Sequence, residues 1–363
     1  MVKDSLANQY AGSLTKDFYC HRCSCKVTER ANTDGRAAEL ADVALYLCDA
    51  CAKKEQKKVD IEKISEYRIL QKVGGGGMSA IYEAWHTSTY RLVALKKIFS
   101  TVAAREGAEG FFQREAHIIQ NLIHPHIVRL IDYRIGGNQF YFVFEYLPGG
   151  DLYTFTRRKV VSITELCTIF CQVLDALHYM HMKGFVHRDI KPHNILLTQD
   201  RRGKLSDFTL TMNVNEVDMT QSDLGRTLLF MAPEEIVNHN YVSPQADVYS
   251  AGVSFYNALT NKFPFSSPKP EEIIRAFSKK KKSKDLVETI LEYKGDLESE
   301  FRTAFENSIL REDRIPVQYY RRDISPGLAT IIDKSVMRNK EDRFKSAQEM
   351  RDVLLAYLNH KTL

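Results

Sequence analysis

The sequence contains no hydrophobic run long enough to cross a membrane. Its longest apolar stretch, residues 166–180, is interrupted by Gln172, Asp175 and His178. A membrane-spanning helix needs about 18 or more predominantly apolar residues. Residues 1–17 are polar and lack the apolar core and small-residue cleavage site of a secretory signal. We therefore expect a soluble protein in a reducing, cytoplasmic compartment.

The chain also has little excess charge of one sign. A net charge of +5 over 363 residues is weak support for a polyanionic partner. Two basic clusters, at 53–58 and 279–284, are of a kind that most often forms a solvated face or a linker. The amino-terminal cluster has no grouped aromatic residues beside it, so a nucleic-acid partner is disfavoured.

Cysteine is concentrated at one end of the chain. Five of the seven cysteines lie in the first 51 residues, and a Lys-, Glu- and Gln-rich stretch follows them. We place a domain boundary there, with a small module and charged linker at 1–59 and a larger domain at 60–363. In the larger domain, β-forming runs come first, at 67–73, 80–85, 92–98, 128–133 and 139–145. Helical patterns follow, at 164–183, 243–260 and 327–336. This order predicts an α+β fold with a first lobe at about 67–145 and a second at about 146–358.

A glycine run, Gly74 to Gly77, joins the first two predicted strands. Glycine lets backbone N–H groups approach a phosphate without a clash from Cβ. No helix follows directly, and Ser79 occupies the third glycine position of G-x-G-x-x-G, which argues against a dinucleotide site. Such a run alone is more often a flexible turn, so the phosphate interpretation depends on other residues.

Lys96 provides that support because it interrupts an otherwise apolar strand and needs a partner there. Glu115 lies nineteen positions later, on a helix predicted to begin near Gly110. An ion pair between the two would hold Lys96 against the α- and β-phosphates of ATP. Taken separately, each residue would be interpreted as a surface charge.

The most specific segment is His187-Arg188-Asp189-Ile190-Lys191-Pro192-His193-Asn194. In this segment Asp189 can orient a hydroxyl group and accept its proton, and Lys191 can neutralise a phosphoryl group in transfer. Asn194 offers an amide oxygen to Mg²⁺. Thirteen residues after Asn194, the segment Asp207-Phe208-Thr209 brings a further carboxylate, that of Asp207.

In this order, the segments resemble the motifs of eukaryotic-type (Hanks-type) serine/threonine protein kinases, and most closely those of bacterial members. A lysine two residues after the catalytic aspartate is typical of the serine/threonine branch. Thr209 departs from the family's D-F-G glycine. A β-branched residue resists backbone states open to glycine, so we expect the movement of Phe208 to be restricted and catalysis to be retained.

The resemblance implies a bilobal kinase fold, with a small antiparallel β lobe carrying one key helix and a large, mainly helical lobe. It implies ATP and Mg²⁺, or Mn²⁺, as cofactors and protein Ser/Thr hydroxyls as substrates. Asn194 and Asp207 would bind the metal. The residues expected to hold ATP are Gly74, Gly76, Ile81, Ala94, Lys96, Glu145, Leu147, Asp151 and Leu196.

The same resemblance implies two structural contacts and one regulatory contact. Glu234, in Ala232-Pro233-Glu234, would pair with Arg343, and Asp247 would brace the catalytic loop. Arg188 would pair with a phosphate on the activation segment, for which Thr220 and Ser222 are the candidates.

The amino-terminal cysteines form a second motif. Cys20-x-x-Cys23 and Cys48-x-x-Cys51 are separated by 24 residues, slightly more than is usual for paired knuckles. Four thiolates suit a tetrahedral structural Zn²⁺ ion, which would supply much of the folding free energy of so small a module. A redox dithiol and unligated cysteines are the alternatives. His21 and Cys25 are interpreted as bystanders, and the partner of this module is unknown.

We therefore predict an active serine/threonine kinase that autophosphorylates in its activation segment and carries a zinc knuckle for targeting or regulation. The rival hypothesis is a pseudokinase or scaffold that binds nucleotide and recruits partners through the knuckle. It depends on Ser79 and Thr209, because Lys96, Glu115, Asp189, Asn194 and Asp207 are all present. A zinc-dependent nucleic-acid binder is a third, weaker alternative.

Overall fold

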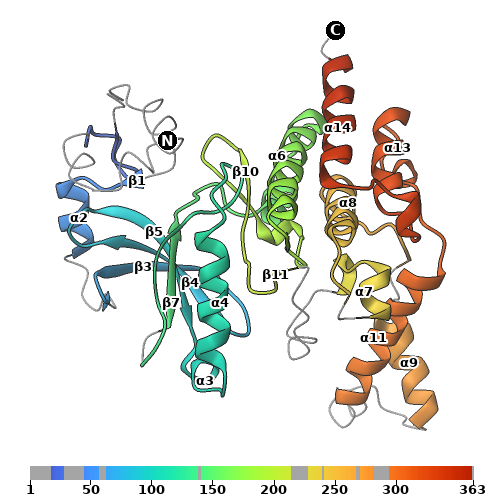
Figure 1. Cartoon of the computed structure of the whole chain (residues 1–363), viewed down its shortest axis with the longest axis horizontal. Coiled ribbons are helices and arrows are strands. Elements are labelled where there is room, and N and C mark those ends of the chain that lie inside the picture. The colour runs from blue at the N-terminus through green and yellow to red at the C-terminus, as the bar shows by residue number, and fades with distance from the viewer. Residues whose placement is uncertain are drawn as a thin grey trace, which may run out of the picture. The chain divides into compact units, whose positions relative to one another are not determined.

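A computed structural model describes residues 18–27, 45–56, 63–137, 140–213, 228–238, 241–266, 270–281 and 294–361 (Figure 1). The chain divides into two compact units. The small unit consists of residues 1–120 and 129–147, and the large unit of residues 121–128 and 148–363. Each unit is considered separately below. Among the described residues, no helix is both long enough and apolar enough to cross a membrane.

The small unit is built on an antiparallel sheet. Its strands follow the order β2 (Lys63–Ile64), β3 (Tyr67–Gly75), β4 (Ser79–His86), β5 (Arg91–Ile98), β7 (Tyr141–Glu145) and β6 (Leu130–Arg134), and β1 (Leu45–Tyr46) pairs with the start of β5. The strands predicted from the sequence are confirmed, although β3 continues into the glycine run. Side chains alternate between the two sheet faces, and one face buries a cluster that includes Ala84, Val93, Leu95 and Val143.

The opposite face of this sheet receives a helix. Helices α3 (Ser100–Ala103) and α4 (Ala108–Gln120) follow β5, and α4 begins two residues before the predicted position. Phe112 and Ala116 of α4 are buried in one cluster with Phe142 of β7. The helical spacing of its apolar residues therefore places one face of α4 on the sheet and leaves the other polar.

The amino-terminal module shares its hydrophobic core with this sheet. Besides β1, its described part includes helix α2 (Asp49–Gln56). Cys20, Tyr46 and Ala52 of the module form one buried cluster with Trp85 of β4 and Leu92 of β5. The sequence predicted a module with little hydrophobic core of its own. In the structure, residues of the sheet supply part of the core in which the module is buried.

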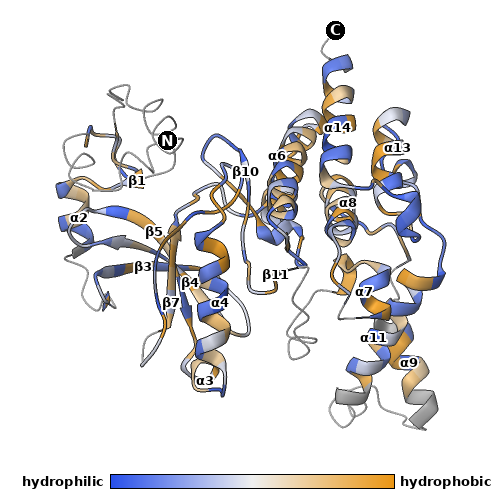
Figure 2. Ribbon diagram, in the orientation of Figure 1, coloured by the Kyte–Doolittle hydropathy of each residue, from blue (hydrophilic) through white to orange (hydrophobic). Residues whose placement is uncertain are grey.

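The large unit is mainly helical. Its longer helices are α5 (Leu152–Arg158), α6 (Ile163–Met182), α8 (Pro244–Thr260), α9 (Pro270–Lys281), α11 (Lys294–Arg311), α13 (Pro326–Ser335) and α14 (Ala347–Lys361), and its shorter ones are α7 (Pro233–Val237) and α12 (Val317–Tyr320). Side chains of Ser162, Ser243 and Ser325 cap α6, α8 and α13 by accepting backbone N–H groups. Orange and blue alternate along α14 in Figure 2, as expected for a helix with one buried face.

Short strand pairs complete this unit. β9 (Ile195–Leu197) pairs with β10 (Gly203–Leu205), and β8 (Phe185–Val186) pairs with β11 (Met212–Asn213). A short 3₁₀ turn, Pro192–Asn194, lies directly before β9. The loop between β8 and β9 is therefore held at both ends by backbone pairing, and it contains the His-Arg-Asp segment.

Candidate active site and metal centre

The glycine run forms the hairpin between β3 and β4. Gly75 has a φ of +142°, and a Cβ added there would lie 2.7 Å from the Ser79 carbonyl oxygen. Gly76 donates its N–H to that same oxygen at 2.9 Å, and nothing lies within 4 Å of a Cβ built at Gly76. The sequence singled out Gly74 and Gly76, but Gly75 is the position where the described conformation requires glycine.

The predicted ion pair between Lys96 and Glu115 is present. Lys96 Nζ lies 3.0 Å from Glu115 Oε1, and both side chains are largely buried. Lys96 lies opposite Ile81 on β4 and Phe142 on β7. A buried charged pair needs good geometry to compensate for lost hydration, and this one joins the central strand of the sheet to α4.

In the large unit, the catalytic-loop residues converge on the carboxylate of Asp189. Lys191 Nζ donates to its two oxygens at 3.1 and 2.8 Å. Asn194 Nδ2 donates to the Asp189 backbone carbonyl and to Oδ2, both at 2.8 Å. Because the amide NH₂ of Asn194 is engaged in this way, its carbonyl oxygen is the group that a hard cation would use.

The segment from Asp207 to Thr209 has a distinctive geometry. The ring of Phe208 is buried, and its centroid lies 5.2 Å from that of His187. Thr209 Oγ1 donates to Asp207 Oδ1 at 2.7 Å. Asp207 and Arg188 have φ values of +63° and +67°, in the left-handed region that non-glycine residues seldom occupy. Strain of this kind is common at functional sites, and no sequence signal indicated it.

Asp247 braces the catalytic loop as predicted. Its Oδ2 accepts the backbone N–H of His187 at 2.8 Å, and its Oδ1 accepts that of Arg188 at 2.9 Å. His181 Nε2 lies 2.8 Å from Oδ2. Burial opposes ionisation, but these partners hold the pKa of Asp247 below its ordinary value. Burial also lowers the pKa of His187, because it disfavours the charged imidazole.

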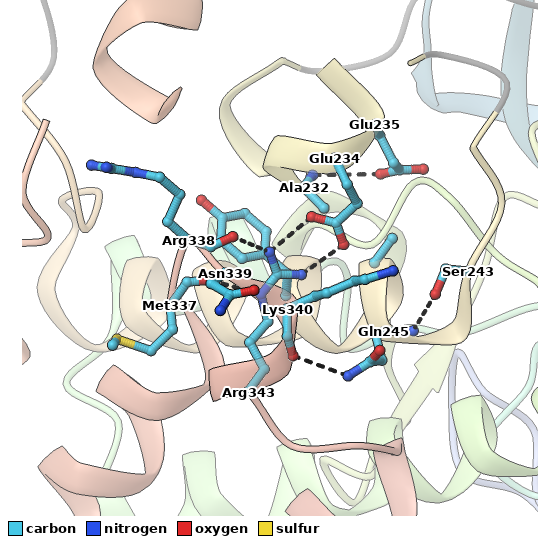
Figure 3. A network of polar contacts seen from close by, with 12 residues as sticks. Ala232, Glu234, Glu235, Ser243, Gln245, Met337, Arg338, Asn339, Lys340 and Arg343 are labelled. Carbon is cyan, nitrogen blue, oxygen red and sulfur yellow. Dashed lines mark hydrogen bonds and ion pairs between the residues drawn. The ribbon is translucent and has the colours of Figure 1, made fainter. Parts of the chain in front are cut away.

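The predicted pair between Glu234 and Arg343 is confirmed. Arg343 Nη1 and Nη2 donate to the two carboxylate oxygens of Glu234 at 2.7 and 2.8 Å. Arg343 also donates to the backbone carbonyls of Met337 and Arg338 (Figure 3). This buried guanidinium ties α7 to the segment before α14.

Arg188 has an acidic neighbour that the sequence did not reveal. Its Nε lies 3.6 Å from Glu235 Oε1, and both side chains are buried. The sequence predicted a phosphate as the partner of this arginine. The candidates Thr220 and Ser222 lie outside the described residues.

The residues expected to hold adenine and ribose are divided between the two units. In the small unit, Ile81 and Ala94 lie on adjacent strands, with Ala94 paired to Glu83 and to Phe144. Glu145 is buried at the end of β7, and Leu147 follows it. In the large unit, Leu196 lies on β9, opposite Lys204 on β10, and forms an isolated bridge with Asp151.

The carboxylate of Asp151 has a structural use. Its two oxygens accept the backbone N–H and the hydroxyl of Thr154, each at 2.8 Å. Asp151 therefore caps the amino terminus of α5. The sequence indicated Asp151 only as a residue that would hold ATP, and the cap was missed.

The four cysteines predicted to bind metal lie together. The sulfur atoms of Cys20, Cys23, Cys48 and Cys51 are all within 4.8 Å of one another. The Cys23 and Cys48 sulfurs are 3.6 Å apart, close to the value of about 3.8 Å expected between ligands of a tetrahedral Zn²⁺ ion. The donor set therefore fits zinc.

The protonation of these thiols supports the same fit. Burial acts in the opposite direction, but the Cys51 N–H and the neighbouring thiols lower the pKa of Cys48 to about 6. Burial and the adjacent cysteines raise the pKa of Cys51. Cys25, interpreted as a bystander, also interacts with Cys48 and Cys23. The thiolate is the form of cysteine that binds a metal ion, so the lowered pKa of Cys48 favours the same fit.

Comparison with known proteins identifies the class. The family model of the protein kinase domain matches residues 67–355, and the chain belongs to this family.

Relatives come from yeast, bacteria and animals. The chain is 34% identical over 203 residues to "Carbon catabolite-derepressing protein kinase" of Saccharomyces cerevisiae, an alignment that covers 56% of this chain and 32% of the relative. It is 33% identical over 213 residues to "Probable serine/threonine-protein kinase pknA2" of Bifidobacterium longum, covering 57% of this chain and 28% of the relative. It is 33% identical over 213 residues to "Aurora kinase C" of Mus musculus, covering 58% of this chain and 76% of the relative. The match thus spans about a third of the length of the first relatives.

Proposed function

We propose that this chain transfers the γ-phosphate of Mg-ATP to serine or threonine hydroxyls of proteins. The observation that carries this proposal is the arrangement around Asp189, where Lys191 and Asn194 fix the carboxylate by three side-chain hydrogen bonds and one backbone contact. A carboxylate held in this way can orient a substrate hydroxyl and accept its proton. Names of relatives that include "serine/threonine-protein kinase" support the same substrate class.

The small unit would supply groups that bind ATP. Glu115 orients Lys96, so its ammonium group would contact the α- and β-phosphates. Gly74 and Gly76 would present backbone N–H groups to the phosphates, with Gly75 setting the turn. Ile81 and Ala94 would contact the adenine ring, and backbone groups of Glu145 and Leu147 would hydrogen-bond its edge.

The large unit would supply the chemistry. Asp207 and Asn194 would hold Mg²⁺, or Mn²⁺, which neutralises charge on the phosphates when bound. Lys191 would neutralise the transferring phosphoryl group. Leu196 would contact the adenine ring, and Asp151 would reach the ribose with a carboxylate that is already ordered by its role as a helix cap.

The remaining assignments extend this proposal. The knuckle, with Cys20, Cys23, Cys48 and Cys51 as ligands, would bind structural Zn²⁺ within the module at 1–59, while the kinase domain occupies 60–363. The protein would act in the cytoplasm on protein substrates and would autophosphorylate on Thr220 or Ser222. Because Arg188 already faces Glu235, a phosphate there would have to share or replace that carboxylate.

The test is transfer of radiolabelled phosphate from Mg-ATP to the protein itself and to a generic basic protein. Wild type is compared with Asp189→Asn and Asp207→Asn, which keep the side-chain size and remove the charge. We expect label on serine and threonine in wild type and a loss of at least about a hundredfold in both variants.

A different outcome would favour the scaffold hypothesis. Wild-type protein that binds ATP and metal but transfers no phosphate, even with candidate activators present, would contradict the proposal. Label on tyrosine alone would contradict the assigned substrate class.

A further inference from the structure

The amino-terminal knuckle is joined to the strand that carries Lys96. Leu45 and Tyr46 of β1 pair with Leu92 and Arg91 of β5. β5 has two edges, and at Leu92 one of them is taken by Trp85 of β4. β1 must therefore pair with the other edge, which is the edge that pairs with β7 later in the strand. The next residue of β5, Val93, pairs with Glu145 of β7. The knuckle therefore follows β7 along the same edge, beside the adenine-binding segment.

The knuckle also covers the same face of the sheet as the proposed nucleotide-binding residues. Side chains alternate along a strand, and β4 and β5 pair without a register shift from Ser79 to Trp85. Hence Ile81, Glu83 and Trp85 of β4 lie on one face with Lys96, Ala94 and Leu92 of β5. The knuckle buries Trp85 and Leu92 on this face. They lie on the same two strands as Ile81 and Ala94, the residues proposed to contact adenine.

One ion pair lies at the junction between these two parts of the face. Glu83, which is opposite Ala94, is fully buried. Arg22, inside the first Cys-x-x-Cys, donates from Nη2 to Glu83 Oε1 at 2.8 Å, and Gln71 donates to Oε2 at 2.7 Å. A buried carboxylate left without its cation is strongly unfavourable, so the sheet depends on the knuckle at this position.

A second contact reaches the segment after β7. The ring of His21 lies 6.0 Å from that of Tyr146 in an edge-to-face arrangement. Tyr146 packs against the knuckle cluster, and it lies between Glu145 and Leu147, whose backbone groups would bind adenine. Burial and the Glu83 carboxylate raise the pKa of Tyr146, so its hydroxyl stays protonated.

We propose that the metal-bound knuckle forms a fixed part of the ATP-binding face, and that Arg22 is a positioning residue acting on that face through Glu83. This inference rests on the proposed kinase function. Ordering the face in advance lowers the cost of binding adenine. ATP affinity should therefore depend on a docked knuckle, although the knuckle supplies no reacting group.

The chain contains a natural reporter of docking. Trp85 is the only tryptophan in the sequence, and it is completely buried in the cluster shared with the knuckle. Removing zinc with a chelator, or the substitution Cys48→Ser, should expose its ring and shift its fluorescence to longer wavelength. Unchanged Trp85 emission in protein whose zinc has been removed would overturn the dependence of docking on the bound metal.

The decisive variant is Arg22→Ala, which keeps all four cysteines. We expect a zinc content equal to wild type, a KM for ATP raised about tenfold and a kcat within about twofold of wild type. Arg201→Ala is the matched control, because Arg201 is an exposed arginine of the large unit that pairs with Glu165. Wild-type ATP affinity in zinc-loaded Arg22→Ala would overturn the proposal.

A second variant, Glu83→Gln, distinguishes a specific effect of Arg22 from a general loss of folding. Glu83→Gln removes the buried charge, so adding Arg22→Ala to it should cost less than Arg22→Ala costs alone. Fully additive effects would contradict the coupling. ATP affinity is also measured by displacement of a fluorescent ATP analogue, which requires no phosphate transfer. An inactive wild type would therefore refute the kinase proposal while the knuckle proposal is still decided.

Discussion

At the scale of single residues, the departure at Thr209 is the most informative. The sequence indicated only that a β-branched residue restricts the backbone at this position. In the structure its hydroxyl also donates to Asp207, the proposed metal ligand. A partner of this kind orients a carboxylate that binds a metal. If Asp207 binds Mg²⁺ as proposed, the hydroxyl of Thr209 would hold that carboxylate in place.

Removing this hydroxyl should weaken metal use. In Thr209→Val, which keeps the branched shape, we expect the Mg²⁺ concentration for half-maximal phosphate transfer to rise about tenfold. Thr209→Ser keeps the donor and should remain close to wild type. The measurement is a Mg²⁺ titration at saturating ATP. Equal Mg²⁺ dependence in Thr209→Val and in wild type would show that the hydroxyl of Thr209 does not contribute to metal binding.

At the scale of elements, short segments are held by buried charges. Helix α7 has only five residues, Pro233–Val237, and a helix of that length has little stability of its own. Glu234 anchors one side of it to Arg343, and Glu235 faces Arg188. Consecutive glutamates of one short helix thus reach two different arginines, one structural and one in the catalytic loop.

The contribution of the buried Glu234–Arg343 pair to stability can be compared with that of an exposed ion pair. Arg343→Ala leaves Glu234 without its cation and should lower the free energy of unfolding by about 3–5 kcal/mol. Lys345→Ala breaks the exposed pair with Glu341 and should cost less than about 1 kcal/mol. Urea unfolding of both variants decides this, and similar small losses would mean that the buried pair stabilises little.

At the scale of the whole molecule, the amino-terminal knuckle and the β-sheet share one core. A module with its own hydrophobic core can unfold alone. A module whose core is shared with a neighbouring sheet is expected to unfold together with that sheet. Because Cys20 and Trp85 belong to one buried cluster, metal release and exposure of Trp85 should be a single event.

A urea titration of zinc-loaded protein tests this. We expect release of zinc, followed with a colorimetric chelator, and the change in Trp85 fluorescence to have the same midpoint. Zinc release at a clearly lower urea concentration than the Trp85 transition would indicate an independently unfolding module.

The strands, the main helices and the catalytic motifs were predictable because their signals are local. Alternation and helical spacing reflect neighbouring residues, and the His-Arg-Asp segment spans only a few positions. The Lys96–Glu115 pair was predictable from one strand and the next helix. The expected pairing of Arg188 with a phosphate stays a prediction. The contact between Arg188 and Glu235 was missed, because a second glutamate in a short helix has no local signature.

By itself the sequence determined the fold class, the family and the cysteine quartet, since each depends on residue types at short, fixed spacings. Only the tertiary structure decided where the knuckle lies. Arg22 and Glu83 are 61 positions apart, and in the sequence each is one charged residue among many. Burial and pairing arise only after the sheet has formed and β1 has joined β5, because long-range contacts depend on how distant segments pack and not on their local composition.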